Sequence, residues 1–308
     1  MAVDVSVETD RLRELERIAS ETRRLIVETI HRAQAGHLGG PLSAADLLVA
    51  LYFDVLRVDP ARPAWPERDR FILSKGHSSV ALYAVLAQRG YFPIAELATF
   101  DAVDSRLQGH PDMAVLPGLD MSAGSLGQGL SPGVGMAIGA RRRGLDFRTV
   151  VMLGDGELQE GQVWEAAFVA ARYGLDNLVA IVDHNRLPQY SWPNASGEGV
   201  TLHQPEIPAR WAAFGWRVLE TDGHDMARVV ATLRHACQGQ EGQEGQEGQE
   251  GQEGRPTVVV AHTIKGKGVS FMEDAFAWHA KPPTDEHRDQ ALAELGALMA
   301  GRSGEMAR

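Results

Sequence analysis

The sequence contains almost no cysteine and no long apolar run. Cys237 is the only cysteine in 308 residues, which excludes an intramolecular disulfide and a cysteine-ligated metal cluster and is typical of a reducing cytoplasm. No apolar stretch approaches the roughly 18 residues that a membrane-spanning helix needs. The first residues also lack the apolar segment of a signal peptide. We therefore expect a cytoplasmic protein without a membrane partner.

Positive charge is also scarce. The formal net charge is −11, which argues against nucleic acid as the main partner. A small phosphorylated ligand is still possible, because it needs only local hydrogen-bond donors. There is no repeat of solenoid length and no clear domain boundary, so we expect a single domain over residues 1–308.

Alternating strand and helix patterns indicate an α/β fold. Apolar residues at helical spacing predict helices over 10–34 and over 43–56, the second with Ser43 as its N-cap. The clearest unit is a strand, a tight turn, a helix and a second strand within about 35 residues, the length of a βαβ unit. The sequence therefore predicts a doubly wound, mostly parallel sheet with helices on both faces. Strands are expected at 71–73, 149–153, 178–182 and 257–261, and a helix at 162–173.

Residues 238–254 interrupt this pattern with repeated copies of Gln-Glu-Gly. Such a run can bury no apolar surface, so we expect a solvated loop that tolerates insertion.

A metal and diphosphate site is indicated by Gly154-Asp155-Gly156 and Asn185. Asp155 follows one predicted strand and Asn185 follows the next, and ligands of parallel sheets bind at such strand ends. A carboxylate, an amide oxygen and the nearby carbonyl of Leu187 would suit Mg²⁺ or Ca²⁺, with Mn²⁺ also possible, completed by diphosphate oxygens. Gly156 would let phosphates approach the backbone closely. The alternative is a turn with a solvated aspartate and a capping asparagine.

Two further features point to a ligand. Four histidines lie beside glycine or in predicted loops, at His37, His77, His110 and His279, where imidazoles can hold hydroxyl groups and move protons. Each alone is more often a turn residue, and their spacing does not resemble a zinc site. The segment 122–131 carries glycines that permit close approach to a flat ligand, although tight packing of the following helix is the alternative.

Together these segments resemble a transketolase, more narrowly the amino-terminal subunit of the split, two-polypeptide form. The resemblance runs through nearly the whole chain and is carried by AGHLGGPLS, GDGELQEGQVWEA, KGKGVSFMED and WHAKPP. It implies the fold of the diphosphate-side domain of thiamine diphosphate enzymes, with a divalent metal. It also implies transfer of a two-carbon ketol unit from a ketose phosphate to an aldose acceptor, as in the pentose phosphate pathway.

The resemblance also assigns roles to single residues. It places Asp155, Asn185 and the Leu187 carbonyl on the metal, and it makes Glu160 part of a subunit contact. The histidines are implied to face the cofactor or the sugar. The cofactor contacts it implies are His77, Gly124, Leu126, Asp155, Gly156 and Asn185, and the catalytic residues are His37, His110 and His279.

A partner subunit is implied as well. In this superfamily a glutamate bonded to the pyrimidine ring drives deprotonation of the cofactor, and it belongs to a pyrimidine-binding domain that follows the part resembled here. We therefore expect a carboxy-terminal subunit and a two-plus-two assembly acting on sugar phosphates. Two alternatives stay open: the alpha subunit of a thiamine-dependent 2-oxo acid dehydrogenase, and a non-catalytic cofactor-binding subunit.

Overall fold

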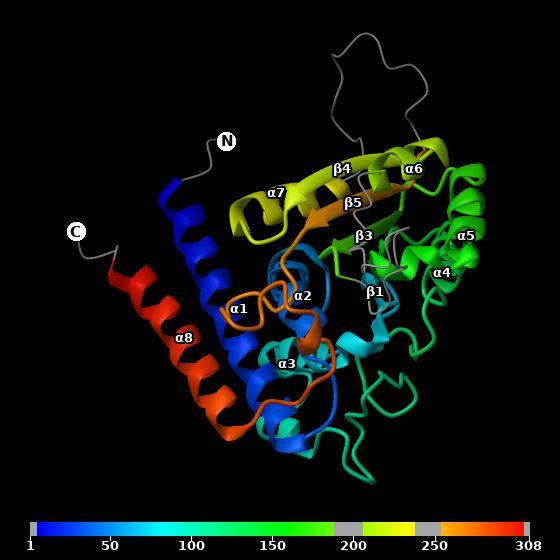
Figure 1. The fold of residues 1–308 in the computed structure, drawn as a ribbon. Helices are drawn as coiled ribbons and strands as arrows, with labels where there is room; N and C mark the ends of the chain where they lie inside the picture. The colour runs from blue at the N-terminus through cyan, green and yellow to red at the C-terminus, as the bar shows by residue number, and fades with distance from the viewer. Residues whose placement is uncertain (1–4, 188–205, 238–253, 305–308) are drawn as a thin grey trace, which may run out of the picture.

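The computed structural model describes residues 5–187, 206–237 and 254–304, and its centre is a parallel sheet (Figure 1). Within these residues the sheet has five strands in the order β1-β2-β3-β5-β4. Every neighbouring pair is parallel, and Gly154 at the end of one strand pairs with Asp183 near the end of the next. The strands are β1 (Arg70–Leu73), β2 (Thr149–Gly154), β3 (Leu178–His184), β4 (Arg217–Asp222) and β5 (Thr257–His262).

Helices cover both faces of this sheet (Figure 1). Successive strand residues point to opposite faces, so Val150 and Met152 enter one core while Val151 and Leu153 enter the other. The predicted doubly wound fold is therefore confirmed. The first core lies under α1 (Val5–Ala33), α2 (Gly39–Ala50), α3 (Ser79–Arg89), α7 (Met226–Cys237) and α8 (Asp285–Gly304); the second lies under α4 (Leu130–Arg142), α5 (Gly161–Arg172) and α6 (Ile207–Ala213).

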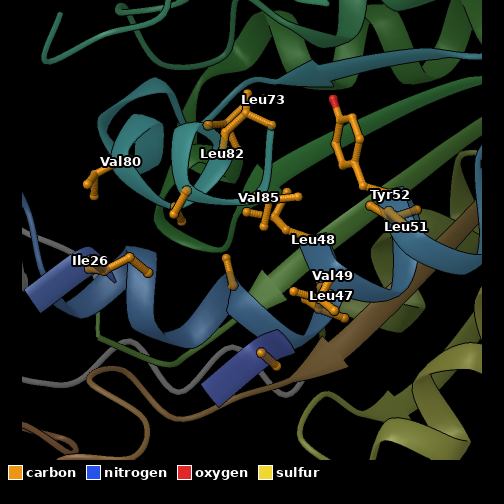
Figure 2. Close-up of a cluster of buried hydrophobic side chains, with 14 of the residues drawn as sticks. Ile26, Leu47, Leu48, Val49, Leu51, Tyr52, Leu73, Val80, Leu82 and Val85 are labelled. Atoms are coloured by element: carbon orange, nitrogen blue, oxygen red, sulfur yellow. The ribbon is translucent and has the colours of Figure 1, made fainter. Parts of the chain in front are cut away.

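Helix α2 differs from its prediction. It begins at Gly39 and every residue through Ala50 is buried, with Leu47 and Leu48 in the cluster of Figure 2. Ser43 is therefore inside the helix and is not its N-cap; its hydroxyl instead lies 2.7 Å from Asp183 Oδ2. A helix that is apolar all round belongs in the core, so no one-sided apolar stripe marks where it begins.

The other expected elements are confirmed to within a few residues. Gly174, expected to end α5, has a left-handed φ of 59° that glycine adopts without strain. The sequence did not predict β4, α3, α6, α7 or α8. Residues 238–253, which hold the Gln-Glu-Gly copies, lie outside the described part. No helix within the described residues has the length and apolarity needed to cross a membrane.

Candidate functional site

One cavity of about 320 Å³ lies at the carboxyl ends of the strands. All ten residues nominated from the sequence line it, although they come from segments spread over most of the chain. This convergence rests on the parallel sheet, since strand ends of adjacent parallel strands meet at one edge. The lining residues are His37, Gly40, Lys75, His77, His110, Gly124, Leu126, Gly154, Asp155, Gly156, Glu157, Gln159, Asn185, Leu187, Lys265 and His279.

Asp155 is held in the turn that follows β2. Its Oδ1 accepts a hydrogen bond from the backbone N–H of Gly156 at 2.7 Å, and its Oδ2 accepts one from Arg186 at 2.6 Å. The side chain is 5% exposed. Burial and the neighbouring carboxylate of Asp183 raise the pKa of Asp155 to about 6, although both backbone donors oppose this. A buried carboxylate kept beside another is poised to receive a cation.

Asn185 and Leu187 lie opposite Asp155, in the turn that follows β3. The amide oxygen of Asn185 accepts from the Leu187 N–H at 3.3 Å. Between them, Arg186 has a φ of 63°, a left-handed conformation that costs a non-glycine residue about 1 kcal/mol or more. The carbonyl oxygen of Leu187 accepts from Lys265 Nζ at 2.6 Å. Three oxygens of different kinds therefore lie along one wall.

Three of the four histidines pack ring against ring. The centroids of His37, His77 and His279 lie 5.1 to 5.5 Å apart, and His110 lines the same cavity. Burial, reinforced by nearby positive groups, lowers the pKa of His37 to about 4 and that of His279 to about 3. The pKa of His77 is lowered for the same reasons. These three rings are therefore neutral at pH 7.

Two lysines of the site were not nominated from the sequence. Lys75 follows β1 and forms a buried ion pair with Asp183. Lys265 follows β5, and its Nζ lies 2.7 Å from Nδ1 of His279. An ammonium group can only donate, so Nδ1 accepts and the ring proton of His279 is on Nε2. Burial and Lys75 lower the pKa of Lys265 to about 8, while the two aspartates oppose the shift.

Glu157 connects the two glycine-rich segments and was also missed. Its carboxylate accepts from the backbone N–H of Gly127 at 2.7 Å and from that of Gly154 at 3.0 Å, with Ser74 as a third donor. Burial raises the pKa of Glu157, although these donors oppose the shift. The carboxylate therefore fixes the loop that carries Leu126 against the turn that carries Asp155.

The glycines of the site divide into two groups. A Cβ on Gly133 would lie 2.6 Å from a methyl group of Val151, so this residue serves helix packing, the alternative weighed for the segment. A Cβ on Gly124 would have His110 as its nearest neighbour, at 3.9 Å. Packing within the chain thus does not require glycine at 124, and its small size keeps the cavity wide.

The donor set fits a hard divalent cation that is shared with a diphosphate. Asp155 supplies one charge, and Asn185 and Leu187 supply neutral oxygens, which is too few ligands to complete a cation's shell without others. No cluster of three or more His, Cys, Asp or Glu side chains suited to a metal occurs within the described residues. Lys75 and Lys265 add positive charge on the same side, which suits an anionic ligand.

Comparison with known proteins agrees with this site. A family model described as "Transketolase, thiamine diphosphate binding domain" matches residues 15–299. One of the two apulose-4-phosphate transketolase chains of this type, from Phocaeicola vulgatus, is 41% identical over 281 residues, covering 91% of this chain and 93% of the relative, which is named as a subunit. The 6-deoxy-6-sulfo-D-fructose transketolase subunit SqwG of a Clostridium species is 40% identical, covering 92% and 96%.

Solved transketolases share the fold. A structure from Pichia stipitis has a TM-score of 0.80 at 28% identity, covering 92% of this chain and 40% of that one. Transketolase from Campylobacter jejuni gives 0.79 at 29% identity, covering 92% and 42%. The chain thus spans about two fifths of these solved enzymes, yet nearly the full length of the two subunits.

These relatives favour the transketolase interpretation over the 2-oxo acid dehydrogenase alternative, and they confirm the resemblance and the thiamine diphosphate cofactor. The chain therefore belongs to the transketolase thiamine diphosphate-binding family and has the length of that family's separate subunits.

Proposed function

We propose that this chain is the amino-terminal, diphosphate-side subunit of a transketolase that moves a two-carbon ketol unit from a ketose phosphate to an aldose acceptor. One observation carries the proposal: a cation-binding wall, two lysines and four histidines share a single cavity. Bound thiamine diphosphate would supply the electron sink for carbon–carbon cleavage. The chain itself would supply binding, orientation and proton handling.

The cation wall is proposed to hold Mg²⁺, or Ca²⁺ or Mn²⁺ in its place, with the diphosphate. Asp155, Asn185 and the Leu187 carbonyl would be the protein ligands, and Gly156 would let a phosphate oxygen approach its backbone. A cation is needed because the diphosphate is an anion and the chain has a net charge of −11. Leu126, Gly124 and His77 would contact the cofactor elsewhere.

The histidines are proposed to handle the sugar. Because His279 carries its proton on Nε2, it can donate a hydrogen bond to a donor-sugar hydroxyl at pH 7 without first gaining a charge. His37, also neutral, would accept or donate on the acceptor side. His110 would complete the hydroxyl contacts and the proton handling. Four intact imidazoles in one cavity argue against a non-catalytic binding subunit.

A second polypeptide is part of the proposal. The relatives of similar length are named as subunits, and solved transketolases are more than twice as long as this chain. The partner would carry the pyrimidine-binding domain and most sugar-phosphate contacts, in a two-plus-two assembly. Glu160, exposed beside the cavity-lining Gln159, would lie at the contact.

Binding and turnover test the proposal together. Calorimetric titration should show that thiamine diphosphate binds tightly only when Mg²⁺ is present. The assembled enzyme should transfer two carbons from xylulose 5-phosphate or fructose 6-phosphate, the sugars found with two of the solved transketolases. Oxidation of a 2-oxo acid with no ketol transfer would overturn the proposal in favour of the dehydrogenase alternative.

A further inference from the structure

A buried carboxylate behind the cavity joins four parts of the chain. Asp183, near the end of the central strand β3, is fully buried. Its Oδ2 accepts from Ser43 Oγ in α2 at 2.7 Å and from Lys75 Nζ after β1, and its Oδ1 accepts from the hydroxyl of Thr263 after β5. The Asn185 amide nitrogen lies 3.5 Å from Oδ2. Asp183 does not line the cavity, so its role there is indirect.

The ion pair with Lys75 fixes the chemistry of this carboxylate. A carboxylate bonded to an ammonium group is ionised and can only accept hydrogen bonds. The group of Asn185 that faces it must therefore be the amide nitrogen, which is the donor. The same nitrogen lies 3.4 Å from Ser43 Oγ, whose own proton goes to Asp183 or to the Gly40 carbonyl. The hydroxyl thus presents a lone pair to the amide.

The opposite side of the same amide is fixed as well. The backbone N–H of Leu187 is a donor and lies 3.3 Å from the amide oxygen of Asn185. Turning the amide by half a rotation would set its oxygen against the Asp183 carboxylate and its nitrogen against the Leu187 N–H. Both new contacts would be repulsive, so a single orientation is enforced from two sides.

We propose that Asp183, assisted by Ser43, is a positioning residue that keeps the carbonyl oxygen of Asn185 turned toward the metal. The amide nitrogen has no lone pair to offer a cation, so a flipped amide would remove one ligand. This inference rests on the proposed function, because it takes Asn185 as a metal ligand. Lys75 contributes by keeping Asp183 ionised, in addition to its place in the cavity wall.

Proton exchange of the Asn185 side chain tests the orientation without any cofactor. The sequence has only three asparagines, at 177, 185 and 194, so protein labelled with ¹⁵N in asparagine side chains gives three amide signals. Asn185→Ala identifies the relevant pair. The amide of Asn177, bonded to the Ala137 carbonyl at 3.0 Å, is the internal reference.

Three variants of the full chain are compared. Ser43→Ala removes a hydroxyl that contacts the amide, and Lys75→Met/Asp183→Leu removes both buried charges together, so that no charge is left unpaired. Thr263→Val is the matched control, because its hydroxyl bonds the same carboxylate at the oxygen away from Asn185. We expect exchange at Asn185 to rise about threefold in Ser43→Ala and about tenfold in the double variant, as for loss of one or more net hydrogen bonds. The control should change less than twofold.

A metal titration then links orientation to ligand binding. At saturating thiamine diphosphate, Ser43→Ala should raise the Mg²⁺ concentration for half-saturation about threefold. In the Asn185→Ala background the same change should have no further effect, since the amide is gone. Equal exchange at Asn185 in all variants, or additive effects on Mg²⁺, would overturn the positioning role. Failure of every variant and of wild type to bind would instead reject the proposed function, while the exchange data still decide the orientation.

Discussion

At the scale of single residues, Asp155 is the only charged side chain among the proposed metal ligands. Asp155→Asn keeps the size and one oxygen but removes the charge that offsets desolvation of the cation. We expect the affinity for thiamine diphosphate with Mg²⁺ to fall at least tenfold, or about 1.4 kcal/mol. Calorimetric titration with and without Mg²⁺ measures this change.

The fold should tolerate this substitution. An asparagine relieves the repulsion between Asp155 and Asp183, but it can accept from only one of the two backbone N–H groups of Gly156 and Arg186. These effects oppose each other, so the melting temperature should move by only a few degrees. A well-folded variant with unchanged Mg²⁺-dependent affinity would show that Asp155 is a turn residue.

The neutral histidines predict a pH dependence of stability in the cofactor-free chain. The folded pKa values of His37 and His279, about 4 and about 3, lie below the ordinary 6.5. Between these values the unfolded chain binds protons that the folded chain does not, so stability is full above about pH 6.5 and is lost as pH falls. The melting temperature should drop from pH 7 to pH 5.

A matched pair of variants isolates this effect. His279→Asn should show a smaller drop than wild type, because one of the protonation sites is gone. His262→Asn, at an exposed histidine paired with Glu220, serves as the control for a surface histidine. A drop in His279→Asn as large as that of wild type would contradict the assignment of His279 as a buried, neutral ring.

The ligand-bearing residues could be predicted from the sequence, but the residues that hold them could not. Asp155 and Asn185 stand directly after recognisable apolar strands, so their convergence follows from a parallel sheet. Lys75 and Asp183 interact across 108 positions of sequence, and a buried ion pair leaves no local pattern. For Lys75 the available signal was its position next to His77, and for Lys265 it was the strand end before it.

At the scale of elements, a buried ion pair joins α1 to α2. Arg23 contacts Asp46 through two hydrogen bonds, and both residues are about 7% exposed. His224 also bonds Asp46 at 2.8 Å and accepts from the Ile264 N–H, next to Lys265. Asp46→Ala leaves the guanidinium buried without its partner, so we expect a loss of about 3–5 kcal/mol in denaturant unfolding.

The double variant Arg23→Met/Asp46→Leu is the matched control. It removes both charges and restores apolar volume, so it should unfold at a denaturant concentration closer to wild type than Asp46→Ala does. If the single and double variants lose the same stability, the loss comes from packing and the ion pair contributes little.

Element boundaries were predictable where one face is apolar, and they failed elsewhere for two opposite reasons. Helix α2 is buried on all sides, so the apolar stripe that marks a helix start was absent. Strand β4 at the sheet edge is mostly half-buried or exposed, and its mixed sequence Arg217–Asp222 carries no apolar run. The four apolar strands inside the sheet or at its other edge were all found.

At the scale of the whole molecule, the fold class follows from one βαβ unit, because a parallel pair of strands requires helices on the faces. The single-domain assignment stays a prediction, as does the cytoplasmic location. What the chain assembles with is decided by surfaces that meet another polypeptide, and no pattern within one chain reports its neighbour. This is why the partner must be tested by reconstitution.

The purified chain should have negligible ketol-transfer activity alone and should regain it when mixed with its partner. The reason is chemical: proton loss from the cofactor needs a carboxylate against the pyrimidine ring, and the described carboxylates of the cavity, Asp155 and Glu157, are both bonded to backbone N–H groups of their own turn. Activity is measured at micromolar concentration of each chain, with Mg²⁺ and thiamine diphosphate saturating. The Asp155→Asn chain mixed with the same partner is the control, because it should assemble yet stay inactive. Robust ketol transfer by the wild-type chain alone would show that the two-subunit proposal is wrong.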